Sequence, residues 1–282
     1  MPIREKGYYN WEGELQRTSF RWFPIFTVGI KSVYKKRFSK LLFASFSSLF
    51  FVFLVALYIS SKPELNGMGK LIRMISSDAL LFRTFYTNGF LIFMSAILSL
   101  FAGSELISND LKHKSISLYL SRPLGKIDYL AGKFSIVMFY LLFFTLVPGL
   151  LLTIFKVIFT GDFSAGFTLL IKSIIFPVII SFFWSSLILM LSSISSNGRF
   201  VKIIFFLFFI FSNILAGMFY AIFKNTHFLY ISIEKTIQQF GSFVFNTGME
   251  FSAPGWISAV VLPGMTALFL LILYIRLKKV EV

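Results

Sequence analysis

Cysteine is absent from this chain of 282 residues, histidine occurs twice, and charged side chains make up only 14% of it. Without cysteine there is no disulfide framework, no thiolate metal site and no cysteine nucleophile. The two histidines, His113 and His227, lie far apart, and no HExxH motif occurs. Zinc-protease chemistry is therefore not indicated, and an intramembrane serine protease would lack its histidine base. We expect no catalytic residue and no metal site.

Apolar residues are abundant instead. They make up 57% of the chain, 39 residues are phenylalanine, and the mean hydropathy is +0.81. This composition excludes an ordinary soluble domain and indicates an integral membrane protein. The formal net charge is +15. Because the basic residues adjoin apolar segments, we expect membrane lipids as their partners and no nucleic acid.

Six apolar windows are long enough to cross a bilayer, whose hydrocarbon core of about 30 Å needs roughly 20 helical residues. They are 41–60, 85–103, 134–155, 167–194, 203–223 and 257–275. We expect an all-α integral membrane protein in which residues 1–282 form a single transmembrane domain. No window contains Asp or Glu. A proton-coupled carrier is disfavoured, because such carriers place ionisable groups at mid-membrane depth.

The positions of Lys and Arg predict the orientation of the six windows, because cytoplasmic segments carry an excess of both. Most of the 27 Lys and Arg residues fall before residue 41, in the 104–133 loop, between the fourth and fifth windows, and after residue 275. Both termini and the 104–133 loop are therefore expected in the cytoplasm. The 224–256 segment becomes a long outer loop, whose apolar positions favour a short amphipathic helix.

Residues 1–40 form a basic cytoplasmic tail, and its second half mixes apolar and basic side chains. Pro24 suits a first helical turn, and Phe26, Ile30 and Val33 recur at helical spacing among the lysines. This pattern predicts an amphipathic helix that lies along the inner leaflet. A helix that binds a protein partner is the alternative.

The 104–133 loop is polar, basic and far longer than a chain reversal needs. Its Ser-Asn-Asp sequence at 108–110 favours the start of a short helix, which a proline then ends. Leu118 falls on the apolar face of that helix, whereas Lys112 and Arg122 are available to acidic partners. Such a helix either transmits force from a cytosolic machine or lies on the bilayer surface.

This loop resembles the corresponding loop in permease subunits of ABC-2 type transporters. The resemblance is carried by Gly103-Ser104-Glu105, Asp110, the LYLSRP run at 118–123 and Gly132-Lys133, which that family arranges in the same way between its second and third spans. It extends more loosely to the N-terminal helix, the six spans and the long outer loop. The resemblance implies an ABC-2, type V exporter-like architecture in the cytoplasmic (inner) membrane of a bacterium.

In that family the loop is a coupling helix that docks in a groove of a separate ATP-binding subunit. By resemblance, the candidate coupling residues are Glu105, Asp110, Lys112, Leu118, Arg122 and Pro123. The resemblance also implies two copies of the ATP-binding subunit, which bind ATP and Mg²⁺, and a second permease that is either a copy of this chain or a homologue.

The chain has no GxxxxGK[ST] phosphate loop of its own. We therefore expect no ATPase activity and no cofactor in this chain. The expected function is that of the membrane subunit of an ATP-driven exporter whose substrate the sequence does not identify. Two alternatives stay open. One is an ABC module that drives mechanical signalling or extracytoplasmic assembly, and the other is a stand-alone membrane scaffold or immunity protein.

Two Pro-Gly pairs, Pro148-Gly149 and Pro263-Gly264, lie at similar depths in the third and sixth windows. They either kink helices around an outer gate or are the ordinary Pro and Gly of membrane helices. Asn88 and Asn213 either line a path or bond between helices. Lys172, six residues inside its window, is expected to anchor the helix at the interface.

Overall fold

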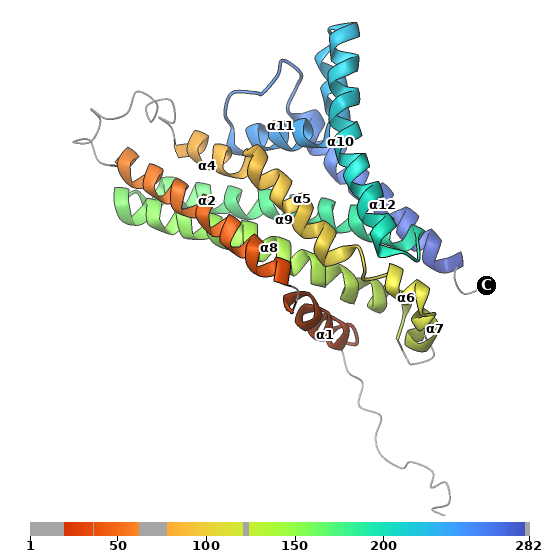
Figure 1. Cartoon of the computed structure of the whole chain (residues 1–282). Helices are drawn as coiled ribbons and strands as arrows, with labels where there is room; N and C mark the ends of the chain where they lie inside the picture. The colour runs from red at the N-terminus through yellow and green to blue at the C-terminus, as the bar shows by residue number, and fades with distance from the viewer. Residues whose placement is uncertain (1–19, 36, 62–77, 121–123, 280–282) are drawn as a thin grey trace, which may run out of the picture.

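The computed structural model describes residues 20–35, 37–61, 78–120 and 124–279, and within these ranges every regular element is a helix (Figure 1). In chain order the helices are α1 (Phe23–Tyr34), α2 (Arg37–Ser61), α4 (Asp78–Thr87), α5 (Gly89–Gly103), α6 (Ser108–Lys112), α7 (Ser115–Leu120), α8 (Lys126–Thr160), α9 (Phe163–Ile194), α10 (Gly198–Phe223), the 3-10 helix η2 (Thr226–Ile231), α11 (Ile233–Phe245) and α12 (Trp256–Lys279). The expected all-α fold is confirmed.

Six of the described helical segments are long and apolar enough to cross a membrane. They are Ala44–Ser61, Gly89–Lys112, Lys126–Thr160, Phe163–Ile194, Gly198–Phe223 and Trp256–Lys278. Each corresponds to one predicted window, so the number and order of the spans agree with the sequence. Helices α8 and α9, with 35 and 32 residues, extend beyond their windows.

The second window, 85–103, is wrong at its start. Helix α4 ends at Thr87, and α5 begins at Gly89 because Asn88 leaves the helical conformation, with φ −58° and ψ 129°. The side-chain oxygen of Asn88 accepts a hydrogen bond from the backbone N–H of Phe90 at 2.8 Å. Asn88 is therefore an N-cap, which satisfies a backbone donor that has no partner inside the helix.

Helices α8 and α9 form the centre of the bundle. Helices α1, α2 and α5 pack against α8, and α12, α5 and α10 pack against α9 (Figure 1). Phe183, Trp184 and Ile188 on α9 are fully buried. All six spans are apolar, but only the central helices are enclosed by other helices on most sides.

Helix α10 leaves the body of the bundle and extends away from it (Figure 1). Its outward side chains are large and apolar, and those of Phe206, Phe211 and Phe223 are exposed. In a membrane protein this surface suits lipid, because hydrocarbon tails are as apolar as the side chains that face them. The phenylalanine side chains of the chain therefore occupy both its outer surface and its core.

Helix α1 packs along the first turns of α8. Glycines allow the close approach: a Cβ on Gly29 would overlap the Ile136 side chain, and one on Gly132 would lie 2.9 Å from the Cβ of Ile25. Tyr140 of α8 also donates its hydroxyl to the carbonyl oxygen of Ile30 at 2.8 Å. A helix is thus present in the region where one was expected, and its amphipathic placement along the inner leaflet stays a prediction.

At the end of the bundle opposite α6 and α7, α4 and α11 pack against each other (Figure 1). The short helix expected within 224–256 is present as α11. Asn213 of α10 accepts a hydrogen bond from the Ser232 hydroxyl, so this asparagine bonds between elements as predicted. Lys172 of α9 donates to the carbonyl oxygen of Phe245 at 3.2 Å. It binds the C-terminal end of α11, where a cation is favourable.

The two Pro-Gly pairs differ in their surroundings. Gly149 receives the aromatic ring of Tyr86, because a Cβ at Gly149 would overlap the Tyr86 hydroxyl. That hydroxyl donates to the carbonyl oxygen of Ser173 at 3.1 Å. Among the described residues, no heavy atom of a neighbour lies within 4 Å of the position that a Cβ on Gly264 would take. Gly149 is therefore a packing site for α4, whereas Gly264 is not a packing site.

Candidate coupling surface

Within the predicted 104–133 loop, two short helices, α6 and α7, take the place of the single helix expected and form a hairpin at one end of the bundle (Figure 1), and the last part of the loop, from Lys126, already belongs to α8. Between the helices, Lys114 adopts a left-handed conformation with φ 54°, which reverses the chain. Asn109, Lys112, His113 and Lys114 are exposed. The hairpin therefore presents polar and basic side chains at its tip.

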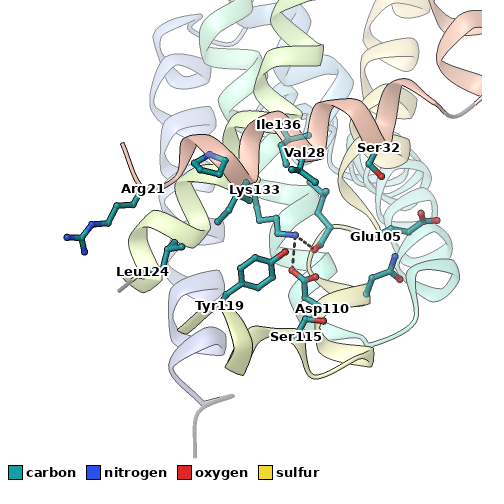
Figure 2. Close-up of a pocket in the computed structure, with 15 residues that line it drawn as sticks. Arg21, Val28, Ser32, Glu105, Asp110, Ser115, Tyr119, Leu124, Lys133 and Ile136 are labelled. Atoms are coloured by element: carbon teal, nitrogen blue, oxygen red, sulfur yellow. Dashed lines mark hydrogen bonds and ion pairs between the residues drawn. The ribbon is translucent and has the colours of Figure 1, made fainter. Parts of the chain in front are cut away.

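A buried ion pair fixes α6 to α8. The Lys133 ammonium lies 2.8 Å from Asp110 Oδ2, with side chains only 9% and 14% exposed (Figure 2). Tyr129 donates its hydroxyl to the same carboxylate oxygen at 2.6 Å, and Lys133 also donates to the carbonyl oxygen of Leu106 at 3.0 Å. The charges are thus both paired and hydrogen-bonded, as burial requires.

Tyr119 of α7 completes this cluster from the other side of the hairpin. Its ring centroid lies 5.6 Å from the Lys133 nitrogen and 5.4 Å from the ring of Tyr129. Burial and then the negative charge of Asp110 raise the pKa of Tyr119 above its ordinary value. The phenol is therefore neutral near pH 7, and the aromatic face attracts the ammonium.

A second ion pair fixes the beginning of the hairpin to α10. Lys202 Nζ lies 2.6 Å from Glu105 Oε1, with side chains 28% and 33% exposed. Gly198, at the start of α10, lies so close to Glu105 that a Cβ would be 2.7 Å from its Cγ. Lys202 also lies 5.5 Å from the centroid of the Phe101 ring. This pair is more exposed than the Asp110–Lys133 pair, so water screens it more.

One serine hydroxyl fixes the turn between α5 and α6 to α9. Ser192 Oγ accepts hydrogen bonds from the backbone N–H groups of Ile107 and Ser108, at 3.2 and 3.1 Å. It donates to the carbonyl oxygen of Ser104 at 3.0 Å. Ser192 is fully buried. It therefore satisfies three backbone groups that the turn leaves without helical partners.

The predicted coupling residues divide into three sets. Glu105 and Asp110 lie at the base of the hairpin, where each binds a lysine of another helix. Lys112 is exposed at the tip. Leu118 belongs to α7, but its side chain, like all of Arg122 and Pro123, lies outside what the structure describes. The Pro148-Gly149 and Pro263-Gly264 pairs lie far from this surface, within α8 and α12.

Sequence reasoning missed the residues of the bundle that receive the hairpin: Tyr129, Lys133, Ser192, Gly198 and Lys202. Lys133 enters the sequence analysis only as part of the Gly132-Lys133 motif and Lys202 only as a cytoplasmic charge, so neither is assigned an acidic partner there. Lys133 directly precedes the predicted window 134–155, and only the start of α8 at Lys126 shows that it lies inside a helix, where a buried charge needs a partner. Ser192 gives no signal of its own, since several serines surround it.

Within the described residues there is no group of three or more His, Asp or Glu that could hold a metal ion. The arrangement at the hairpin is one of attachment: two ion pairs and one hydroxyl connect α6 and its flanking turn to α8, α9 and α10. These contacts hold the hairpin in a fixed position against the bundle, and the exposed tip of the hairpin is basic.

The helices together define a multi-pass membrane protein with an attached hairpin at one end. A family model described as ABC-2 family transporter protein matches residues 28–282. The chain therefore belongs to the ABC-2 transporter family, and it is the transmembrane part of an ABC transporter. Membership implies partnership with an ABC ATP-binding subunit. Among proteins of curated function, no match is found.

Proposed function

We propose that this chain couples ATP hydrolysis on a separate subunit to the export of a substrate across the membrane. The observation that carries the proposal is the α6–α7 hairpin, which has an exposed basic tip and a base fastened by buried contacts. A docking helix must be both accessible and rigidly connected to transmit a displacement. The hairpin combines the two properties.

Three connections offer a route from the hairpin into the bundle. The Asp110–Lys133 pair leads to α8, the Ser192 hydroxyl to α9, and the Glu105–Lys202 pair to α10. A push on α6 would therefore reach three spanning helices at once. Such a shift moves packed helices as units, because interdigitated cores do not deform continuously.

Helix α1 joins the same route through α8. Gly132 contacts α1, and the next residue, Lys133, binds α6. Two neighbouring residues of α8 thus contact both α1 and the hairpin. We infer that α1, α6 and α7 move with the first turns of α8.

ATP and Mg²⁺ belong to the partner in this proposal. Two ATP-binding subunits and two permeases, either copies of this chain or homologues, would form the complex. Both termini and the hairpin would face the cytoplasm at the cytoplasmic (inner) membrane, as the distribution of Lys and Arg favours. Coupling residues would then act in two ways, Lys112 by contact and Glu105 and Asp110 by positioning.

Co-expression with candidate ATP-binding subunits, followed by affinity purification and an ATPase assay, tests the proposal. Lys112→Glu reverses a charge at the exposed tip and should abolish co-purification. Lys278→Glu is the matched control, because Lys278 is exposed near the C-terminus of α12 and lies outside the hairpin. It should leave co-purification unchanged.

Glu105→Gln separates transmission from docking. It removes the ion pair with Lys202 but leaves the tip intact, so the ATP-binding subunit should still co-purify while stimulation of its ATPase falls. If no ATP-binding subunit co-purifies with the parent chain, or if Lys112→Glu and Lys278→Glu behave alike, the coupling proposal fails. Co-purification without transport, together with an extracytoplasmic partner, would favour a mechanical or assembly role instead.

A further inference from the structure

An apolar groove of about 390 Å³ lies between α8, α9 and α12. Helix α9 packs against both of the other helices. In the lining of the groove, the ring centroids of Phe134 on α8 and Phe182 on α9 lie 5.1 Å apart. The volume falls in the range of small-molecule sites in proteins. The coupling route described above does not use this groove.

Helix α8 contributes one continuous face to the groove. Six of its residues line the space, with the three- and four-residue spacing of a single helical face: Ile127, Leu130, Ala131, Phe134, Ser135 and Met138. Tyr129 and Lys133, which bind the hairpin, lie on roughly the opposite face. From Ile127 to Met138 the groove face extends about 17 Å. This length is close to the depth of one leaflet, or half of a hydrocarbon core of about 30 Å.

The groove suits a hydrocarbon chain. Its lining surface is almost entirely apolar. The one hydroxyl of the lining, on Ser135, donates to the carbonyl oxygen of Ala131 at 2.7 Å, so its proton is already used within α8. Ile127 and Phe182 are 73% and 40% exposed. The groove is therefore open along the side of the bundle that membrane lipid contacts.

A cation lies just beyond one end of the groove, where α8 begins and α12 ends. Leu273 is the last residue of α12 in the lining, and Arg276 follows one turn later on the same side of the helix. Arg276 is exposed, and within the described residues it takes part in no ion pair. Tyr274, also exposed, suits the headgroup layer at this depth. An arginine at a helix end reaches that layer and binds phosphate with two parallel hydrogen bonds.

The acidic side chains in this part of the sequence do not cancel the basic ones. Residues 126–128 and 276–282 together carry four basic and two acidic side chains. One of the two acids, Asp128, accepts a hydrogen bond from the backbone N–H of Gly125 at 3.2 Å. A positive charge therefore remains at this end of the groove, and it favours an anionic headgroup over a zwitterionic one.

We propose that the groove binds one anionic glycerophospholipid. One acyl chain lies along the α8 face between Ile127 and Met138, and the phosphate lies at Arg276. The site does not depend on which leaflet is cytoplasmic or on an ATP-binding subunit. Bound there, the lipid fills the space between α8 and α12, and it supports α8 on the side roughly opposite to the hairpin.

Lipid retention tests the groove. The full chain is reconstituted in nanodiscs that contain equal amounts of phosphatidylethanolamine and phosphatidylglycerol, transferred to detergent, and examined by native mass spectrometry. We expect one retained phosphatidylglycerol per chain. Leu270→Trp fills the groove from α12 and should lower the retained fraction at least about tenfold. Ala131→Trp fills it from α8 and should do likewise if Leu270→Trp is poorly folded.

Leu268→Trp is the matched control for the groove. Leu268 is an exposed residue of the same helix that does not line the space. The added ring should therefore face bulk lipid, and the variant should retain phosphatidylglycerol as the parent chain does.

Arg276→Gln separates the headgroup from the acyl chain. It removes the cation but leaves the groove intact, so one lipid should still be retained while the ratio of phosphatidylglycerol to phosphatidylethanolamine falls towards one. Arg199→Gln removes another exposed arginine, at the start of α10. It should leave the ratio unchanged.

Equal retention of the two lipids by the parent chain overturns the lipid site, and so does unchanged retention in both Leu270→Trp and Ala131→Trp. A second copy of this chain is the competing occupant. Because the chain contains no cysteine, a disulfide formed between two chains by Ile127→Cys would report that copy and would also overturn the lipid site. None of these measurements uses an ATP-binding subunit, so their failure is distinguishable from failure of the coupling test.

Discussion

The two ends of the bundle are both fastened by ion pairs, but the pairs differ in burial. At the α6–α7 end, Asp110 and Lys133 are 14% and 9% exposed. At the α4–α11 end, Lys156 is 9% exposed, but its partner Asp78, 2.5 Å away, is 41% exposed. Arg83 and Glu250, the other pair there, are 13% and 33% exposed. The Asp110 carboxylate is thus the enclosed one, whereas Glu105 at the same end, 33% exposed, is as hydrated as Glu250.

The surfaces of the two ends differ in the opposite sense. The α6–α7 end exposes a polar, basic tip. At the α4–α11 end several aromatic rings are buried: the ring centroids of Tyr86 and Phe245 lie 5.7 Å apart, and so do those of Phe176 and Phe240. One end is firmly attached at its base yet open to a partner. The α4–α11 end is held together mainly by the packing of its aromatic rings, and its ion pairs are secondary contacts.

Removing the lysine at each end should show the largest difference. Lys133→Met leaves the enclosed Asp110 carboxylate without its cation, which should cost about 3–5 kcal/mol of the free energy of unfolding. Lys156→Met leaves Asp78 accessible to water and should cost about 1 kcal/mol or less. Unfolding of both purified variants in one detergent measures the difference. Equal losses would show that the two ends are equally dependent on charge.

Packing at the α4–α11 end should give the next largest effect. Gly149→Ala forces the Tyr86 ring to move and should cost about 1–3 kcal/mol. Gly264→Ala meets open space and should be neutral or stabilising by up to about 1 kcal/mol, because alanine favours a helix interior. The same unfolding measurement applies. If both variants are equally unstable, kinking at Pro-Gly pairs outweighs the contact with Tyr86.

A double-mutant cycle on Glu105 and Lys202 should give a smaller coupling energy. The side chains are 33% and 28% exposed, so their interaction energy should be about 1 kcal/mol or less and should fall as salt is added. A matching cycle on Asp110 and Lys133 should give more and respond less to salt. A salt-insensitive Glu105–Lys202 pair would contradict the ranking of the two contacts.

The smallest effect concerns Asp162, between α8 and α9. Its carboxylate accepts hydrogen bonds from the backbone N–H groups of Ser164 and Ala165 at 3.1 Å, and these bonds hold the pKa of Asp162 below its usual value of 3.8. Protons therefore bind more weakly in the folded state, and the resulting stability is present above the unfolded pKa and is lost as pH falls through the folded pKa.

Asp162→Asn keeps the helix cap but cannot titrate. The difference in midpoint of thermal unfolding between the parent chain and this variant should be constant near pH 7 and shrink as pH falls below about 4. A difference that does not change over this range would mean that the negative charge contributes nothing at this position.

The spans and the coupling loop are predictable from the sequence because both depend on local patterns. Long apolar windows indicate segments buried in lipid, and a long basic loop indicates an accessible segment. The attachments of the loop depend on residues brought together by the fold. Ser192 can bind the turn before α6 only because α5 and α9 pack side by side. Gly149 is a packing site only because the Tyr86 side chain of α4 lies against it.

Asn88 illustrates a different limit. Within an apolar window it looks like a single tolerated polar side chain, whereas its backbone ends one helix and its side chain begins the next. The hydropathy of the window carries no information about this break. An N-cap residue inside an apolar run predicts a new helix start, whereas the run itself predicts a continuous helix. Here the cap determines where the spanning helix starts.

The break at Asn88 leaves α5 only 15 residues long, or about 22 Å. A hydrocarbon core of about 30 Å is longer than that. The spanning segment Gly89–Lys112 makes up the length by including this turn and α6, so the turn that carries Glu105 belongs to the end of the segment. Carboxylates there would be expensive without a cation within reach. The short helix thus gives a reason for the lysines of α8 and α10 at these positions: each neutralises a carboxylate close to the end of the spanning segment.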